Sequence, residues 1–134
     1  MRAMGVDFGS KRIGLAVGDA EHGIASPCGL LTSSGTLLKD AEAIGVVGRR
    51  EQADLLVVGL PLELDGTHSP MSRVCGQLVA KLQAIGWDVR TVDESFSSIE
   101  AEEGLVYDRA SQRRKRRDGA AACVILERFF RGQA

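Results

Sequence analysis

The order of the apolar segments constrains the fold most strongly: two short runs come first, and helix-like and strand-like segments then alternate along the chain. Residues 3–9 and 12–19 have the composition of strands. The turn between them, at residues 9–11, is so short that it predicts an antiparallel hairpin. A compact apolar run at 54–61 is typical of a strand that is covered on both faces. We therefore expect an α/β protein in which helices flank a mixed sheet.

Periodicity places the remaining elements. Further strands are predicted at 23–32 and 87–94, and helices are predicted at 37–47, at 74–85, from the capping box at Ser97 and Glu100, and from 118 onward. The residues expected on one buried face of the middle helix are Val74, Leu78, Leu82 and Ile85. Gly45 and Gly48 weaken the first helix, because glycine is a poor helix former. Since no repeat or linker interrupts the pattern, we expect residues 1–134 to form one domain.

Charge is unevenly distributed along the chain. The formal net charge is only −1, but from Arg109 onward eight Lys and Arg residues face two acids, a net charge of +6, and the first 108 residues carry −7. Residues 113–117 are five consecutive cations. A local block of this kind matters more for binding a polyanion than the mean charge does, so nucleic acid is the expected partner.

Three cysteines, Cys28, Cys75 and Cys123, stand far apart and lack the spacing of a zinc site. We expect them to be reduced thiols of a cytoplasmic protein. Charged residues interrupt the apolar run at the start of the chain, and no stretch approaches the length of a membrane span. No membrane partner is therefore expected.

Asp7 lies inside the first predicted strand. Met4 and Val6 should point to one face of the sheet, and Gly5 and Asp7 to the other. A carboxylate in the centre of a sheet is costly unless it is paired or holds a metal. Asp7 is therefore either an acceptor for the amides of the turn at residues 9–11 or a metal ligand.

Two further acids stand at the ends of elements. Glu94 closes the last predicted strand, at the edge where open α/β sheets bind ligands, although a solvated acid beside a helix N-terminus would look the same. Asp118 has helical spacing to the apolar Ala122 and Ile125 and is expected on their face. Asp118 has two alternative roles: it could complement the helix dipole at the N-terminus of this helix, or it could pair with the cations that precede it.

Together, the three carboxylates offer the oxygen ligands that a hard divalent cation needs. Two Mg²⁺ or Mn²⁺ ions held about 4 Å apart can activate water and stabilise the leaving oxygen in phosphodiester hydrolysis. The basic run before Asp118 would then hold phosphates beside the metals. These residues predict a metal-dependent nuclease.

Four segments, in this order, resemble the motifs of the YqgF (RuvX-like) family of the RNase H-like superfamily. Members of that family are described as Holliday-junction resolvase-like proteins and as pre-16S rRNA nucleases. The segments are GVDFGSKRIGLAVGD at 5–19, VVGLPLELDGTHSP at 57–70, VDESFSSIEAE at 92–102 and KRRDGAAACVILERF at 115–129. The resemblance runs nearly end to end, and it implies an RNase H-like fold with a five-stranded mixed sheet flanked by helices.

The resemblance also implies roles for individual residues. The catalytic and metal-binding acids would be Asp7, Glu94 and Asp118. A loop that positions the substrate would include Gly59, Pro61, Asp65 and Gly66. The cations expected to contact nucleic acid are Lys11, Arg12, Arg113, Arg114, Lys115, Arg116 and Arg117.

One position departs from the family pattern. The third motif of the family usually continues Asp-Glu-Arg, whereas here Ser95 follows Glu94. If the family arginine contacts a substrate phosphate, its loss weakens binding in this chain, or a cation elsewhere replaces it. Arg90 and the segment at 109–117 are the two candidates for such a replacement.

The function expected from the resemblance is endonucleolytic processing of the 5′ end of precursor 16S rRNA, with ribosomal or transcription factors as further partners. Resolution of Holliday junctions is the first alternative, and it would call for a symmetric dimer; the sequence leaves monomer and homodimer open. The segment DFGSKRIGLAV also resembles the first phosphate loop of actin-like and Hsp70-like ATPases. A non-catalytic RNA-binding factor is the third alternative.

Overall fold

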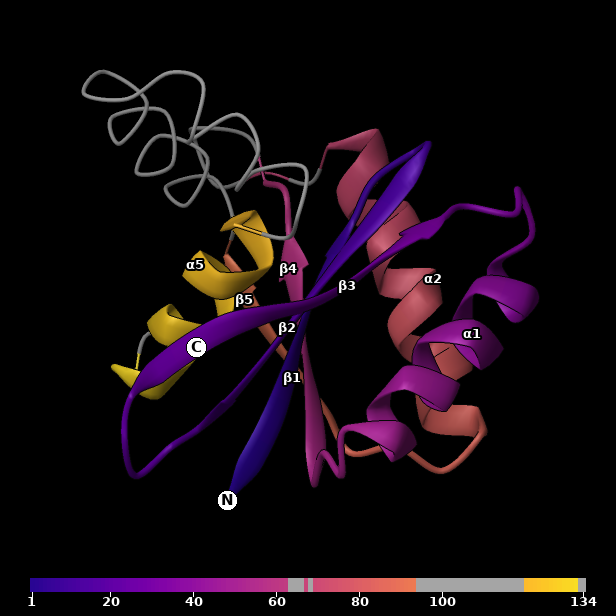
Figure 1. Ribbon diagram of the computed structural model, residues 1–134. Coiled ribbons are helices and arrows are strands. Elements are labelled where there is room, and N and C mark those ends of the chain that lie inside the picture. Colours follow the sequence, from indigo (N-terminus) through magenta and orange to yellow (C-terminus); the bar gives the residue numbers. More distant parts are fainter. Residues whose placement is uncertain (63–66, 68, 94–119, 133–134) are drawn as a thin grey trace, which may run out of the picture.

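The computed structural model describes residues 1–62, 67, 69–93 and 120–132, and in this part of the chain five strands form one sheet (Figure 1). The strands are β1 (Arg2–Phe8), β2 (Arg12–Asp19), β3 (Ile24–Thr32), β4 (Leu55–Leu60) and β5 (Val89–Asp93). Their order is β3-β2-β1-β4-β5. Strand β2 pairs antiparallel with β1 and β3, and β4 pairs parallel with β1 and β5. The predicted hairpin and the five-stranded mixed sheet are confirmed.

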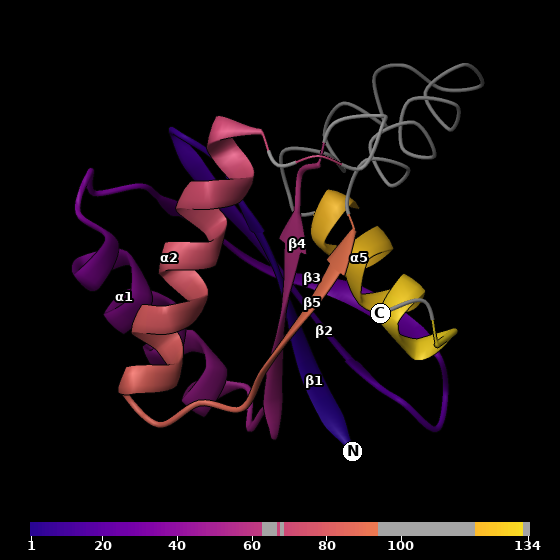
Figure 2. The ribbon, with the colours of Figure 1, turned by 180° about the vertical axis from the view of Figure 1, so that it is seen from behind.

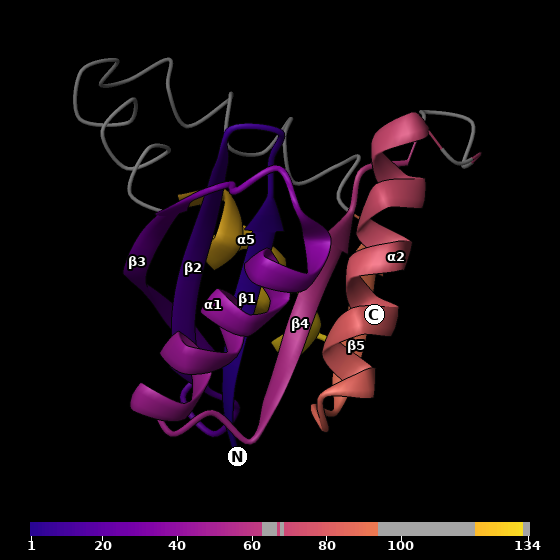
Figure 3. The same cartoon turned by 90° about the vertical axis from the view of Figure 1, so that its right-hand side faces the viewer.

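Helices cover both faces of the sheet. Helices α1 (Leu37–Arg50) and α2 (Pro70–Ala84) lie on one face, and α5 (Ala120–Phe130) lies on the other (Figures 2 and 3). The helix predicted from Ser97 lies outside the described residues. No helix in the described residues has both the length and the apolar composition needed to cross a bilayer.

The alternation of β1 divides the core into two layers. Met4, Val6 and Phe8 belong to the buried cluster under α1 and α2. Ala3 belongs to the cluster under α5, and Gly5 also faces that helix. The expectation that Met4 and Val6 point away from Gly5 and Asp7 is therefore confirmed.

Helix α1 continues through both glycines that weakened its prediction. A Cβ placed on Gly48 would lie 2.8 Å from the ring of Trp87, and one placed on Gly45 would lie 3.0 Å from its Nε1. The glycines therefore make room for the indole ring against the helix. This tertiary contact offsets the low helix propensity of glycine.

Helix α2 begins earlier than its apolar periodicity indicates. Ser69 is its N-cap: the Ser69 hydroxyl oxygen accepts the N–H of Ser72 at 3.0 Å, and Pro70 starts the helix. At the other end, Ile85 follows the last helical residue and is 41% exposed, so its predicted place on the buried face is wrong.

The carboxyl ends of β1, β4 and β5 lie at one edge of the sheet, the upper edge in Figures 1 and 2. Both α2 and α5 begin at this edge. We call it the carboxyl edge. The candidate functional residues in the described part of the chain gather there.

Candidate active site

Asp7 lies one residue before the carboxyl end of the central strand β1. It is half-buried and points to the α5 face, because it alternates with Val6 and Phe8 of the opposite layer. In the described part of the chain no group donates to the Asp7 carboxylate or pairs with it. The N–H of Gly9 donates instead to the carbonyl of Arg12 at 2.9 Å. The interpretation of Asp7 as an acceptor for the turn amides is therefore not supported.

Glycines flank Asp7 on both neighbouring strands. Gly14 of β2 is its direct partner in the antiparallel pair. In the parallel pair Val6 lies beside Val58, and continuing that register by one residue brings Gly59 of β4 beside Asp7. Neither glycine has a side chain, so neither of these two positions places one beside the carboxylate. Sequence reasoning missed Gly14, although a glycine inside a strand signals close approach of another group.

The loop after β4 is anchored at both of its ends. The Ser69 hydroxyl donates to the carbonyl of Pro61 and also caps α2, so that it ties the two elements together. Gly59 and Pro61, two residues of the predicted positioning loop, therefore lie at the carboxyl edge, where β4 ends and α2 begins. Asp65 and Gly66 lie outside the described residues.

Two of the three predicted acids, Glu94 and Asp118, lie outside the described residues, as do the cations at 113–117. Their neighbours in the chain are described: Asp93 is the last residue of β5, and Ala120 is the first residue of α5. Within the described ranges no three His, Cys, Asp or Glu side chains come together as a metal site.

Cations stand near Asp7. Lys11 and Arg12 are exposed in and beside the turn between β1 and β2, at the carboxyl edge. Arg90, by contrast, bonds to both carboxylate oxygens of Asp88, at 3.1 and 3.3 Å, and this pairing raises the pKa of Arg90. Because Asp88 precedes β5, the Arg90 guanidinium is held at the opposite end of that strand. Arg90 is therefore a poor replacement for the arginine missing at Ser95.

A second arginine contacts the carboxyl end of β5. Arg128 of α5 is 9% exposed, and its Nη1 donates to the backbone carbonyl of Asp93 at 2.9 Å. This contact joins residues 35 positions apart. No periodic pattern in the sequence indicated it.

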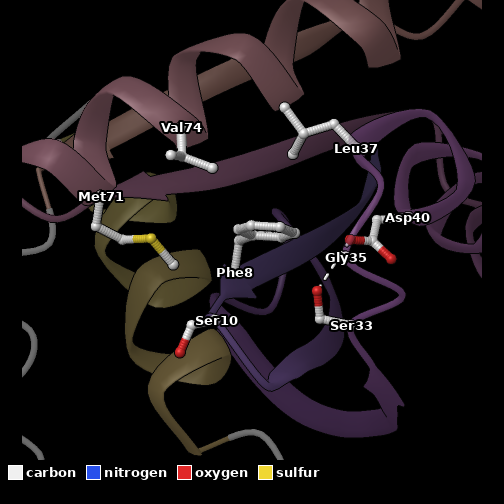
Figure 4. Close-up of a pocket in the computed structure, with 8 residues that line it drawn as sticks. All are labelled: Phe8, Ser10, Ser33, Gly35, Leu37, Asp40, Met71 and Val74. Carbon is white, nitrogen blue, oxygen red and sulfur yellow. Dashed lines mark hydrogen bonds between the residues drawn. The ribbon is translucent and has the colours of Figure 1, made fainter.

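A separate pocket of about 250 Å³ opens on the opposite face of the sheet (Figure 4). Its apolar lining comes from Phe8, Leu37, Met71 and Val74. Its charged group, Asp40, is 3% exposed and accepts the hydroxyl of Ser33 at 3.0 Å and the N–H of Ser34 at 2.8 Å. These bonds hold the loop before α1, so Asp40 has a structural role.

Comparison with known families gives a match over residues 1–132 to the family described as RuvX, Holliday junction resolvase. Two relatives named "Putative pre-16S rRNA nuclease" are similar over nearly their whole length. The protein of Chlorobium luteolum is 38% identical over 96% of this chain and 93% of its own. That of Anaeromyxobacter sp. (strain K) is 40% identical over 95% of this chain and 94% of its own.

Solved structures show the same arrangement of strands and helices. T. thermophilus RuvC in complex with a Holliday junction substrate has a TM-score of 0.59 and 15% identity, over 98% of this chain and 94% of that chain. A second structure of Thermus thermophilus RuvC has a TM-score of 0.54 and 13% identity, over 100% and 98%. At this level of identity the likeness shows the fold, which is RNase H-like.

Proposed function

We propose that this chain, which belongs to the RuvX family, is a nuclease that hydrolyses phosphodiester bonds of structured nucleic acid with divalent metal ions. The observation that carries this proposal is the environment of Asp7. A half-buried carboxylate without a donor in the described chain, with glycine on both sides, is costly unless a cation completes it.

The residues present fit Mg²⁺ or Mn²⁺, which prefer oxygen ligands on rigid elements. We assign Asp7, Glu94 and Asp118 as the ligands, in a site for two ions. The contact of Gly5 with Ala122 supports this assignment, because it sets the first turn of α5 over β1, two residues from Asp7. When bound, such ions supply an activated water and stabilise the leaving oxygen.

The chain's own residues would bind and orient the substrate. Lys11 and Arg12 are exposed at the carboxyl edge and can bind phosphates of the substrate. The cations at 113–117 would extend this contact. Gly59 and Pro61, with Asp65 and Gly66 of the same loop, would let the nucleic-acid backbone approach Asp7 closely.

For the cellular role we propose processing of the 5′ end of precursor 16S rRNA, because both relatives above are named for that substrate. The description of the family favours Holliday junction resolution as the second candidate. We assign residues 1–134 to one nuclease domain that works in the cytoplasm, as a monomer or a homodimer.

Cleavage of a precursor 16S rRNA fragment and of a four-way DNA junction, with Mn²⁺ or Mg²⁺ and with chelator, tests the proposal. Asp7→Asn and Asp118→Asn should each lower the cleavage rate by more than about 100-fold, the upper range for losing a residue that only supports a ligand. Glu42→Gln, which changes an exposed acid of α1, is the matched control and should cleave like wild type.

The outcomes separate the candidate roles. The substrate that wild type prefers distinguishes rRNA processing from junction resolution. Cleavage that survives chelation would exclude the metal mechanism. Binding of both substrates without any cleavage would favour the non-catalytic RNA-binding factor.

A further inference from the structure

The pocket on the face of α1 and α2 lies at the carboxyl edge, and we call it the Phe8 pocket (Figure 4). Phe8 is the last residue of β1, Ser10 lies in the turn that follows, and Met71 and Val74 belong to the beginning of α2. Phe8 follows Asp7 directly. The pocket and the Asp7 carboxylate are therefore at the same end of β1, on opposite faces of the sheet, and a ligand that passes over this edge can reach both.

The size and the lining of the Phe8 pocket suit one planar ring system. Its volume of about 250 Å³ is just below the range of roughly 300–1,000 Å³ found for pockets that hold drug-sized ligands. Leu37, Met71 and Val74 surround the Phe8 ring in Figure 4. Ser10 is exposed and adds a hydroxyl that can bond to a polar edge of the ligand. A nucleobase has such an edge around an apolar face, and unpaired bases stack on aromatic side chains.

Exposed cations stand beside the Phe8 pocket. Lys11 follows Ser10 in the turn after β1, and Arg73 lies in the chain between Met71 and Val74 of α2. Proteins that bind unpaired nucleotides combine aromatic side chains for the bases with cations for the backbone phosphates. The charge around this apolar pocket therefore matches a nucleotide, with its base in the pocket and its phosphate at the cations.

Hydrogen bonds hold the rim of the Phe8 pocket in place. The N–H of Ser33 donates to the carbonyl of Lys11 at 2.9 Å, which ties the loop after β3 to the turn after β1. The hydroxyl of Ser33 and the N–H of Ser34 donate to the two carboxylate oxygens of the buried Asp40. Because these bonds already order the rim, a ligand that enters the pocket loses little affinity to ordering it.

We infer that the Phe8 pocket binds an unpaired nucleobase of the nucleic-acid substrate, an inference that rests on the proposed function. Asp7 and Phe8 are consecutive residues, so their Cα atoms are about 3.8 Å apart. A base in the pocket therefore belongs to the nucleotide at the cleaved bond or to a near neighbour. A base that is paired and stacked inside a duplex cannot enter a protein pocket, so the preferred substrate has an unpaired nucleotide close to the cleaved bond.

The affinity for two fluorescein-labelled RNA duplexes, measured by fluorescence anisotropy in chelator, tests this inference. One duplex carries a single unpaired adenosine, and the other carries an abasic residue at the same position. Wild type should bind the first about 10-fold more tightly, as expected for stacking of one base on an aromatic side chain. Both duplexes have the same number of phosphates, so charge cannot cause the difference. Equal affinities overturn the inference.

A variant that fills the pocket locates the base. Val74→Phe adds a ring without changing the charge, and it should lose the preference for the unpaired adenosine. Val46→Phe, the matched control, makes the same change at a residue of α1 that is 56% exposed and does not line the pocket, and it should keep the preference. A preference that persists in Val74→Phe overturns the inference. If Val74→Phe does not fold, Met71→Gln is measured instead: an unchanged preference overturns the inference, and a reduced preference supports it.

Cleavage with Mn²⁺ separates this inference from the function on which it rests. If wild type neither binds nor cleaves any of the nucleic acids, the nuclease function is wrong and the role of the Phe8 pocket falls with it. If wild type cleaves nucleic acid but binds and cleaves the two duplexes equally well, only the role of the pocket is wrong. If wild type prefers the unpaired adenosine, Val74→Phe does not, and nothing is cleaved, the base site is supported and the nuclease function is wrong.

Discussion

The Asp7 carboxylate is half-buried and accepts no hydrogen bond from the described chain, so we expect it to lower the stability of the metal-free protein. We expect Asp7→Asn to raise the free energy of unfolding in chelator on the order of 1 kcal/mol. The same variant should lose the extra stability that Mn²⁺ binding gives wild type. Urea denaturation with and without Mn²⁺ measures both effects, and Glu42→Gln should show neither. A less stable Asp7→Asn protein in chelator would contradict this account.

Cys28 and Cys123 are partly buried free thiols. Burial, and then the negative charge of Glu51, raises the pKa of Cys28 from 9.0 to about 11. Burial, and then the charge of Glu127, raises the pKa of Cys123 to about 11. The folded state therefore holds these two protons more tightly than the unfolded chain does. The contribution of the two thiols to the free energy of unfolding is fully present below pH 9.0 and is lost as the pH rises through about 11.

The raised pKa values predict slow alkylation of both thiols. A shift of this size lowers the thiolate fraction near neutral pH about 100-fold, and the thiolate is the reactive form. Iodoacetamide should therefore modify Cys28 and Cys123 about 100-fold more slowly in the folded protein than in urea. Mass spectrometry of the alkylated peptides measures each rate. Equal rates in the folded and unfolded protein would show that the thiols are not protected.

At the scale of elements, α5 packs against β1 through Gly5. A Cβ at this position would lie 2.7 Å from the carbonyl oxygen of Ala122 and 3.0 Å from the Cβ of Leu126. Gly5→Ala should therefore push α5 away from the sheet and lower the free energy of unfolding by about 1–3 kcal/mol. Cleavage should also fall, because the first turn of α5 begins two residues after Asp118.

Gly76→Ala is the matched control for that substitution. Gly76 is an exposed residue of α2, and a Cβ there would meet nothing within 4 Å. The Gly76→Ala variant should have a free energy of unfolding about 0.5–1 kcal/mol higher than wild type, because alanine favours a helix more than glycine does. Urea denaturation of both variants gives the comparison. Destabilisation of the same size in both would mean that the packing of α5 on Gly5 is not the cause.

Local patterns predicted the elements well, and tertiary contacts account for the errors. Strand β2 has the bounds that were predicted for it, Arg12 and Asp19. Helix α1 runs through Gly45 and Gly48 because Trp87, from a distant segment, packs against them. Periodicity placed Ile85 in the core, but α2 ends one residue earlier and leaves it exposed.

At the scale of the whole molecule, the site depends on which strands lie side by side. Alternation within β1 predicted the face that Asp7 occupies. Gly14 and Gly59 lie on either side of Asp7 because of the sheet order, in which β1 pairs antiparallel with β2 and parallel with β4. The bond from Arg128 to Asp93 likewise links segments 35 residues apart. No short-range pattern encodes such contacts, so the sequence predicted the place of Asp7 in its strand but not Gly14 beside it or the contact of Arg128 with Asp93.

The uneven charge of the molecule predicts how binding depends on salt. The chain carries a net charge of +6 from Arg109 onward, and Lys11 and Arg12 are exposed. Cations that bind phosphates release counterions, so the affinity for nucleic acid should fall steeply as the salt concentration rises. Lys11→Gln combined with Arg12→Gln should reduce the slope of log affinity against log salt by about 2, because each of these side chains would neutralise roughly one phosphate. Fluorescence anisotropy of labelled RNA, measured in chelator to prevent cleavage, gives this slope.

Two cations at the opposite edge of the sheet provide the matched control for the salt dependence. Arg50 ends α1 and Lys81 lies in the last turn of α2; both are exposed and far from the carboxyl edge. Arg50→Gln combined with Lys81→Gln removes the same total charge as the first pair. If the effect depends on position, only the pair at Lys11 and Arg12 changes the slope. Equal slopes for both double variants would mean that net charge alone attracts the nucleic acid and that the turn beside Asp7 does not contact phosphate.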